Sequence, residues 1–332
     1  MVRRKTVRRK TVRRKTVRRK TSKQRKSRSS RLRSYRRRVK TSHCRGRNAG
    51  RVFRSVQDKN MHVALCFCVR DCEPYLKRIF SNIDALRCGL PQTKLTCIFV
   101  YDNCVDNSPA LLHAYKQQQE NVIVQGIENT SHMRTVRIAK ARNACLEQLY
   151  KLPNVQYHMM IDSDDCCANK WNIDLIRTYL QGGNGDGDWD CISFNRKNYY
   201  DIWALLFDDF KHHCWGFASR ADNNKVGETM RKEITRKLNN ANNSIEVMSA
   251  FNGFAIYKTG RFSGFQYDGH GSTFMTLFTD DERVRVETVL SRKYGILTKC
   301  VLTDESCEHL FYHLTAFKSG RKIKISKWDI FL

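Results

Sequence analysis

The sequence lacks several features that would place a protein in a well-defined class. It has no run of about 18 apolar residues, so no membrane-spanning helix is expected. Its N-terminus has no apolar segment of the kind found in secretory signals. No close pair of its 14 cysteines has the two-residue gap of a zinc knuckle. Most of the cysteines lie in apolar runs such as VALCFCV, which predicts reduced, buried thiols, with disulfides or metal binding as the alternative.

Acidic residues are absent from the N-terminal segment. Residues 1–54 contain 26 of the 61 Lys and Arg and no Asp or Glu, and VRRKT occurs there four times. Because like charges repel and apolar residues are scarce, we expect residues 1–57 to form a disordered basic tail. The remaining chain has 35 basic and 32 acidic residues, so the folded part is nearly neutral. That balance gives no case for nucleic-acid recognition by the folded part, whereas the tail is expected to bind polyanions, either nucleic acid or an acidic membrane.

From residue 61 onward, apolar runs alternate with segments of helical periodicity. We expect strands at 61–69, 95–101, 121–125, 155–161 and 189–194, with helices between them at 70–88, 109–119, 134–150 and 171–180. This alternation predicts an α/β fold with a mostly parallel sheet and helices on both faces. Ligands of such sheets bind at the carboxyl ends of the strands. We therefore expect a nucleotide-binding half at 58–195 and an acceptor or sugar half at 196–332.

Three carboxylates stand within four residues at the end of the apolar run 155–161. Such crowding raises carboxylate pKa values or requires a cation, and Mg²⁺ or Mn²⁺ prefers oxygen ligands shared with nucleotide phosphates. We predict that Asp162 and Asp164 bind the metal and that Asp162 and Ser163 contact a nucleotide sugar. Asp164 and Asp165 are candidate catalytic residues. The alternative is that these aspartates cap the following helix, for which Asp165 is best placed.

A second acidic pattern, VYDNCVDNS, follows the expected strand at 95–101. A carboxylate at a strand end can accept hydrogen bonds from a ribose or a base, so Asp102 and Asp106 are candidate nucleotide-sugar contacts. The alternative is an Asx turn followed by a helix cap at Asp106 or Asn107.

Basic and neighbouring residues complete the candidate nucleotide site. Val69 and Arg70 close the first strand and are candidate nucleotide-sugar contacts. Arg137 and Arg142 lie in the helical segment 134–150, where a guanidinium can pair with a diphosphate. A solvated basic helix face is the alternative.

The second half of the chain supplies the remaining candidates. Asn252 and Gly253 lie in the aromatic and Gly-containing segment SAFNGFAIYK, which suits the wall of a sugar site. His309 is a candidate imidazole ligand for the metal, with a structural histidine as the alternative. An inverting transferase needs a general base, for which Glu246 and Asp281 are candidates, whereas a retaining one does not require either of them.

Seven segments between residues 63 and 324 carry a resemblance to a known family. They are CVRDCEPYLKRIFSNI, VYDNCVDNS, RIAKARNACL, MIDSDD, YYDIWAL, SAFNGFAIYK and SCEHLFYH. In order and spacing they resemble GT-A-fold glycosyltransferases similar to the fungal capsule-associated α-1,3-mannosyltransferases. The resemblance implies a GT-A-like fold, hexose transfer from a nucleoside-diphosphate sugar such as GDP-mannose, a divalent cation, and a glycan or glycoprotein acceptor.

The resemblance also assigns roles to individual residues. Asp162-Ser163-Asp164 matches the family's Asp-x-Asp motif, Asp102 matches the acid that contacts the nucleotide, and Glu308-His309 matches an acid–His element near the metal. Golgi members of the family carry a membrane anchor where this chain has a basic tail. Anchorless forms are also similar to glycosyltransferases of large DNA viruses, so we expect a soluble protein of the cytoplasm or of a virus-infected cell, with the nucleus as a further location.

Two other functions stay open at the level of sequence. The first is nucleic-acid binding through the basic tail. The second is a metal-dependent nucleotidyltransferase, which also uses paired aspartates but more often has a Gly-rich phosphate loop near the first strand. The segment CVRDCEPY contains no Gly.

Overall fold

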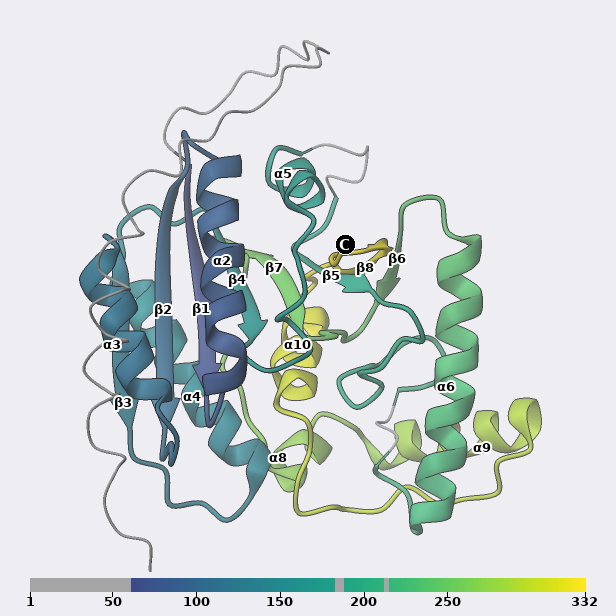
Figure 1. Cartoon of the computed structure of the whole chain (residues 1–332). Helices are drawn as coiled ribbons and strands as arrows, with labels where there is room; N and C mark the ends of the chain where they lie inside the picture. The colour runs from purple at the N-terminus through teal and green to yellow at the C-terminus, as the bar shows by residue number, and fades with distance from the viewer. Residues whose placement is uncertain (1–60, 183–187, 212–214) are drawn as a thin grey trace, which may run out of the picture. The chain divides into compact units, whose positions relative to one another are not determined.

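The computed structural model describes residues 61–182, 188–211 and 215–332. The predicted basic tail, 1–57, lies outside the described residues, as does most of the loop GGNGDGD. The described residues form an eight-stranded sheet with the strand order β3-β2-β1-β4-β7-β5-β8-β6 (Figure 1). The sheet is packed between helices, which confirms the α/β fold class expected from the sequence.

The first four strands of the sheet are all parallel. They are β1 (His62–Val69), β2 (Lys94–Asp102), β3 (Val122–Ile127) and β4 (Tyr157–Asp162). Cys68 stands opposite Asp162 on β4, and Val69 stands opposite Tyr101 on β2. The carboxyl ends of β1, β2 and β4 therefore meet at one edge of the sheet, which is where ligands of such sheets bind.

The other half of the sheet is mixed. It contains β5 (Cys191–Asn195), β6 (Ser244–Val247), β7 (Phe254–Lys258) and β8 (Ile323–Asp329). Strand β7 runs antiparallel to both β4 and β5, β5 pairs in parallel with β8, and β6 is antiparallel to β8. Because β7 starts at the edge where β4 ends, the residues just before β7 lie beside the acidic turn that follows β4.

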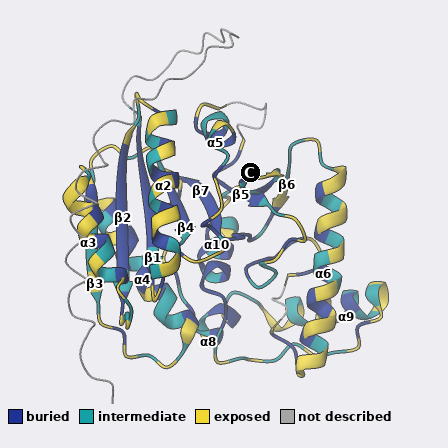
Figure 2. Cartoon of the chain, in the orientation of Figure 1, coloured by how far each residue is buried: buried dark blue, intermediate teal, exposed yellow. Residues whose placement is uncertain are grey.

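Helices cover both faces of the sheet. One face carries α2 (Glu73–Gly89), α3 (Ser108–Gln118) and α5 (Ile173–Leu180), and the other carries α4 (Arg134–Tyr150) and α10 (Glu308–Lys318). Successive strand residues point to opposite faces of the sheet. Leu65 and Phe67 therefore pack on the face that α2, α3 and α5 cover, whereas Ala64 and Cys66 pack on the face that α4 and α10 cover. Figure 2 shows β1 and β2 as buried throughout most of their length, whereas β3 at the edge of the sheet is mostly half-buried. Burial on both faces explains why β1 and β2 appear in the sequence as continuous apolar runs.

The remaining helices lie in the second half of the chain. They are α6 (Arg220–Asn240), α7 (Thr259–Phe262), α8 (Gly271–Met275) and α9 (Asp280–Tyr294). Helix α9 begins with a reciprocal capping box between Thr279 and Glu282 and ends at Gly295, whose φ of 63° suits a glycine. Within the described part of the chain, no helix combines the length and apolar character needed to cross a bilayer.

Candidate functional site

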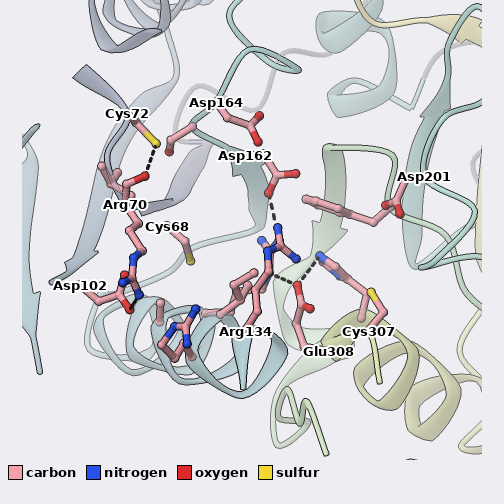
Figure 3. Close-up of a pocket in the computed structure, with 18 of the residues that line it drawn as sticks. Cys68, Arg70, Cys72, Asp102, Arg134, Asp162, Asp164, Asp201, Cys307 and Glu308 are labelled. Atoms are coloured by element: carbon pink, nitrogen blue, oxygen red, sulfur yellow. Dashed lines mark hydrogen bonds and ion pairs between the residues drawn. The ribbon is translucent and has the colours of Figure 1, made fainter. Parts of the chain in front are cut away.

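A cavity of about 540 Å³ lies at the carboxyl edge of β2, β1 and β4 (Figure 3). Helix α4, the start of α10 and the segment around Tyr200 complete its walls. The cavity brings together nine of the residues predicted from the sequence: Val69, Arg70, Asp102, Arg137, Arg142, Asp162, Ser163, Asp164 and His309. Its volume lies within the range of small-molecule pockets, about 300–1,000 Å³.

The acidic turn after β4 is the centre of the site. The Asp162 backbone N–H donates to the carbonyl of Gly253 (2.9 Å), which fixes the end of β4 against the start of β7. The Asp164 carboxylate accepts a hydrogen bond from the backbone N–H of Cys166 (3.1 Å) and remains exposed. Ser163 points inward: it is buried, and its hydroxyl has no hydrogen-bond partner among the described residues. The turn therefore presents two carboxylates at the cavity.

Arg142 links the acidic turn to the C-terminal helix. Its Nη2 donates to Asp162 Oδ1 (3.0 Å) and its Nε donates to Glu308 Oε1 (2.8 Å). In Figure 3, dashed lines run from the labelled Asp162 and Glu308 to the unlabelled guanidinium between them. The residue is only 3% exposed, and its guanidinium lies 4.7 Å from the ring centroid of Phe251. Arg142 is therefore a buried ion-pair partner and not part of a solvated helix face. Its Nη1 atom has no hydrogen-bond partner within the described residues.

Burial sets the protonation behaviour of the site. It raises the pKa of Asp162 to about 7, against the opposing effect of Arg142 and with a further increase from Asp164. Burial also opposes the charge of Arg142, but Glu308 and Asp162 outweigh it and raise the pKa of the guanidinium well above its ordinary value. Burial, followed by the charge of Arg142, lowers the pKa of His309 well below the ordinary range, so this imidazole is neutral.

Asp102 occupies the end of β2 on the other side of the cavity. It is 6% exposed, lies 3.5 Å from the guanidinium of Arg70, and accepts a hydrogen bond from Asn129 (3.3 Å). Arg137 also lines the cavity, but its Nη1 donates to the carbonyls of Ser131 and His132 (3.0 and 2.9 Å). Asp102 is therefore placed to accept a hydrogen bond from a ligand, whereas Arg137 mainly stabilises the loop before α4.

His309 lies in the cavity wall but not in the acidic group. It is 1% exposed and stacks on Phe251 with a centroid separation of 3.7 Å. Oxygen or sulfur atoms of Asp162, Asp164 and Cys166 all lie within 4.8 Å of one another, and His309 is not part of that group. Its role as a metal ligand stays a prediction.

Three predicted carboxylates lie away from the cavity lining. Asp165 is exposed beside the acidic turn, Glu246 is exposed on β6 opposite Lys324, and Asp281 is exposed in the first turn of α9. The general-base candidates Glu246 and Asp281 therefore do not line the cavity beside the acidic turn. Strand β6 is the edge strand after β8, and α9 contributes no residue to the cavity lining.

Asp106, Asn252 and Gly253 have structural contacts instead of a place in the lining. Asp106 accepts hydrogen bonds from the backbone N–H groups of Glu73 and Ser108 (both 2.9 Å), the first residues of α2 and α3. This agrees with the helix-cap alternative. Asn252 is buried and donates to the carbonyl of Phe194 (2.9 Å), and Gly253 supplies the carbonyl that fixes Asp162.

Sequence reasoning missed Asp201, which also lines the cavity. Its two carboxylate oxygens accept the backbone N–H groups of Ala204 (3.2 Å) and Asn252 (3.1 Å). Burial raises the pKa of Asp201 to about 6, although both hydrogen bonds oppose this shift. The available signal was an acidic residue inside the aromatic run YYDIWALLF.

Comparisons with known proteins add no family assignment. No family model matches the chain, and no curated protein matches it. The structural neighbours are glycosyltransferases at low identity. S. aureus TarS 1–349 has 12% identity and a TM-score of 0.37, with 74% of this chain and 59% of that chain covered.

Two further neighbours were solved with ligands. The mannosyltransferase PcManGT from Pyrobaculum calidifontis, in complex with GDP-Man and Mn²⁺, has 14% identity and a TM-score of 0.36, covering 64% of this chain and 51% of that chain. GalNAc-T7 with UDP, GalNAc and Mn²⁺ has 9% identity and a TM-score of 0.41, covering 82% and 43%. The chain spans less than two thirds of each neighbour, and at these TM-scores the likeness does not establish a shared ligand or family.

Proposed function

We propose that the protein is a metal-dependent glycosyltransferase that moves a hexose from a nucleoside-diphosphate sugar to a glycan hydroxyl. The observation that carries this proposal is the composition of one cavity. Carboxylates from the ends of the two parallel strands that flank β1, Asp102 on β2 and Asp162 on β4, face it together with the turn residue Asp164 and the buried cation Arg142. A diphosphate can pair with Arg142, and a ribose hydroxyl can donate to Asp102. A divalent cation can bind the carboxylates of Asp162 and Asp164.

The acidic turn fits a divalent cation. Arg142 donates to Oδ1 of Asp162, and Oδ2 accepts a hydrogen bond from the neighbouring Cys166 thiol (3.8 Å), which a cation bound at Oδ2 would replace. The exposed Asp164 carboxylate supplies a second oxygen close to it. Hard divalent cations take such carboxylates together with phosphate oxygens. A Mg²⁺ or Mn²⁺ ion held there would neutralise negative charge on the departing nucleoside diphosphate.

Arg142 and Asp102 would hold the two ends of the donor nucleotide. Arg142 lines the cavity and its buried Nη1 has no partner among the described residues, and a phosphate oxygen that reached this donor would satisfy it. Asp102 would accept a hydrogen bond from a ribose hydroxyl, with Arg70 fixing the carboxylate orientation. Asp102 lies at the end of β2 and Arg142 on α4, so the two residues together would set the direction in which the donor binds.

The second half of the chain would bind the sugar and the acceptor. Tyr200, Trp203 and Phe251 line the cavity with aromatic rings that can pack against sugar C–H surfaces. Asp201 lies among them and is the carboxylate that we propose as general base if transfer inverts the anomeric centre, in place of Glu246 and Asp281. This supports the division into a nucleotide half, 58–195, and an acceptor half, 196–332. GDP-mannose is the first donor to test, because the sequence resemblance implies it.

Donor turnover by an Asp164→Asn variant tests the proposal. We expect the wild-type protein to hydrolyse or transfer one nucleotide sugar only with a divalent cation, and the variant to lose at least about 100-fold in turnover because metal stabilisation contributes several kcal/mol. Asp281→Asn is the matched control, since Asp281 is exposed and lies outside the cavity lining. Unchanged turnover in Asp164→Asn, or metal-independent turnover in the wild type, would contradict the assignment.

A further inference from the structure

The acidic turn contains a thiol as well as carboxylates. Cys166 follows Asp164 by two residues, and its Sγ lies 3.8 Å from Asp162 Oδ2. One ligand atom each from Asp162, Asp164 and Cys166 lies within 4.8 Å of the other two. These atoms come from three alternate positions of one short turn, so their convergence does not depend on a distant segment of the chain.

Neighbouring groups hold the thiol in this place. Tyr200 Oη donates to Cys166 Sγ (3.3 Å), and the Sγ of Cys167 lies 3.5 Å away. Gly253 provides the necessary space, because a Cβ at this position would lie 2.7 Å from Cys166 Sγ. Its φ of 88° also disfavours any side chain. The backbone around the turn is therefore shaped to admit the sulfur atom.

A second observation indicates that a ligand binds beside this turn. Arg142 is 3% exposed and lines the cavity that Asp162 and Asp164 also line, yet its Nη1 has no partner in the described part of the chain. A buried, unpaired guanidinium nitrogen is costly unless an anion satisfies it. Arg142 donates to Oδ1 of Asp162, whereas the Cys166 thiol donates to Oδ2 of the same carboxylate. The oxygen next to the sulfur atom is therefore not paired with the guanidinium. An anion on Arg142 and a cation on the turn would complement each other.

We infer that Cys166 is the third protein ligand of the cation at Asp162 and Asp164, so that this site favours ions with affinity for sulfur, such as Zn²⁺ or Co²⁺, over Mg²⁺. The inference rests on the metal site of the proposed function. On binding, the Cys166 S–H bond breaks, its proton passes to solvent, and a metal–sulfur bond forms without any change in oxidation state. Thiolate ligands favour softer ions, whereas a site made only of carboxylates suits Mg²⁺ and Mn²⁺.

Another group of the same composition provides an internal control. Asp71, Cys104 and Asp106 also bring ligand atoms within 4.8 Å of one another. There, however, Asp71 Oδ1 accepts the backbone N–H of Val105 (2.7 Å), and Asp106 is engaged by the N–H groups that start α2 and α3. We expect no cation at this group, so Cys104→Ser is the matched variant for Cys166→Ser.

Cobalt titration of the full chain, with a reductant that contains no thiol, tests the inference directly. We expect the wild-type protein to develop a sulfur-to-cobalt charge-transfer band in the near ultraviolet that saturates at one equivalent. The band should disappear in Cys166→Ser and in Asp164→Asn and persist in Cys104→Ser. Absence of the band in the wild type, or its persistence in Cys166→Ser, would overturn the inference without relying on any variant's activity.

Ion competition measures the selectivity. Losing even an outer partner of a metal ligand costs about 10- to 100-fold in affinity, so Cys166→Ser should weaken Zn²⁺ binding by at least about tenfold. Mg²⁺ affinity should change by less than about threefold, because Mg²⁺ gains little from sulfur. Equal losses for both ions would show that the variant merely disturbs the turn and would refute the role of the sulfur as a ligand.

The two levels of the argument fail in different ways. If Asp164→Asn abolishes ion binding and donor turnover while Cys166→Ser leaves the cobalt spectrum unchanged, the thiol is not a ligand and the glycosyltransferase proposal stands. If Cys166→Ser removes the charge-transfer band but no nucleotide sugar is turned over with any ion, the metal site stands and the proposed function falls.

Discussion

Two groups in this protein each bring two aspartates and a cysteine together, and they differ in what occupies the oxygens. In Asp71–Cys104–Asp106, backbone N–H groups of Val105, Glu73 and Ser108 take up the carboxylates. In Asp162–Asp164–Cys166, the oxygens of Asp162 accept from side chains, namely Arg142 and the Cys166 thiol, and one oxygen of Asp164 accepts a backbone N–H. The comparison teaches that the composition of a cluster does not define a site; the site is defined by which ligand atoms the backbone leaves available.

The first way to sharpen the comparison is to remove the cation that holds the acidic turn. Arg142→Met keeps the volume of the side chain but leaves Asp162 and Glu308 without their common partner. Removing one partner of a buried ion pair costs about 3–5 kcal/mol, so we expect a loss of this size in the free energy of unfolding. Chemical denaturation measures it.

The control for this variant is Arg70→Met. Arg70 pairs with Asp102 at 3.5 Å but its side chain is 43% exposed, so solvent screens the pair and its loss should cost about 1 kcal/mol or less. Equal losses for the two arginines would contradict the view that Arg142 is the buried structural link of the site.

The second prediction concerns the pH dependence of stability. The pKa of Asp201 is raised from 3.8 to about 6, so between these values the folded state binds more protons than the unfolded state. Stability from this group is therefore greatest at low pH and falls as pH rises from about 4 to 6. Asp162, whose pKa is raised from 3.8 to about 7, adds a loss of the same sign that extends to pH 7.

Asp201→Asn isolates one part of this effect. We expect the decline in unfolding free energy between pH 4 and 6 to become smaller by about 1–2 kcal/mol, less than a full shift would give because solvent reaches part of the site. Denaturation at several pH values measures the slope. A decline that is unchanged or steeper in the variant would refute the assignment.

The smallest expected effect is at Asp71–Cys104–Asp106, where backbone N–H groups already bind the carboxylates. Asp106→Asn weakens the acceptor for the first N–H groups of α2 and α3, which should lower stability by about 1 kcal/mol, as for other helix caps. Donor turnover should remain within about twofold of wild type. A loss of turnover comparable to that of Asp164→Asn would mean that the two groups cannot be separated in this way.

Local patterns in the sequence were sufficient for the first half of the fold. The apolar runs predicted β1 to β5, and in all of these except β3 they reflect burial on both faces of the sheet. The periodicity of 134–150 predicted α4 with the observed bounds. The position of the acidic turn followed from the same pattern, since it closes β4. The antiparallel direction of β7 had no local signal, because strand direction depends on how the chain returns to the sheet.

Contacts between distant residues account for what the sequence did not reveal. Arg142 and Glu308 are separated by 166 positions, and no local pattern encodes such a pair. Asp102 is the last residue of β2 and Asp106 follows in the next loop, but only the placement of α2 and α3 brings Asp106 to the N-termini of these two helices. Cys166 directly follows the segment MIDSDD. Most other cysteines lie in apolar runs, a pattern that predicts thiols in the core and gives no indication that Cys166 is part of the site.

Anomalous scattering from crystals grown with Mn²⁺ and a nucleoside diphosphate tests the central claim most directly. The account expects one manganese peak between the carboxylates of Asp162 and Asp164, with a diphosphate oxygen on the ion and another within hydrogen-bond distance of Arg142 Nη1. A peak at Asp71–Cys104–Asp106 instead, or a diphosphate bound without any metal at the acidic turn, would contradict it.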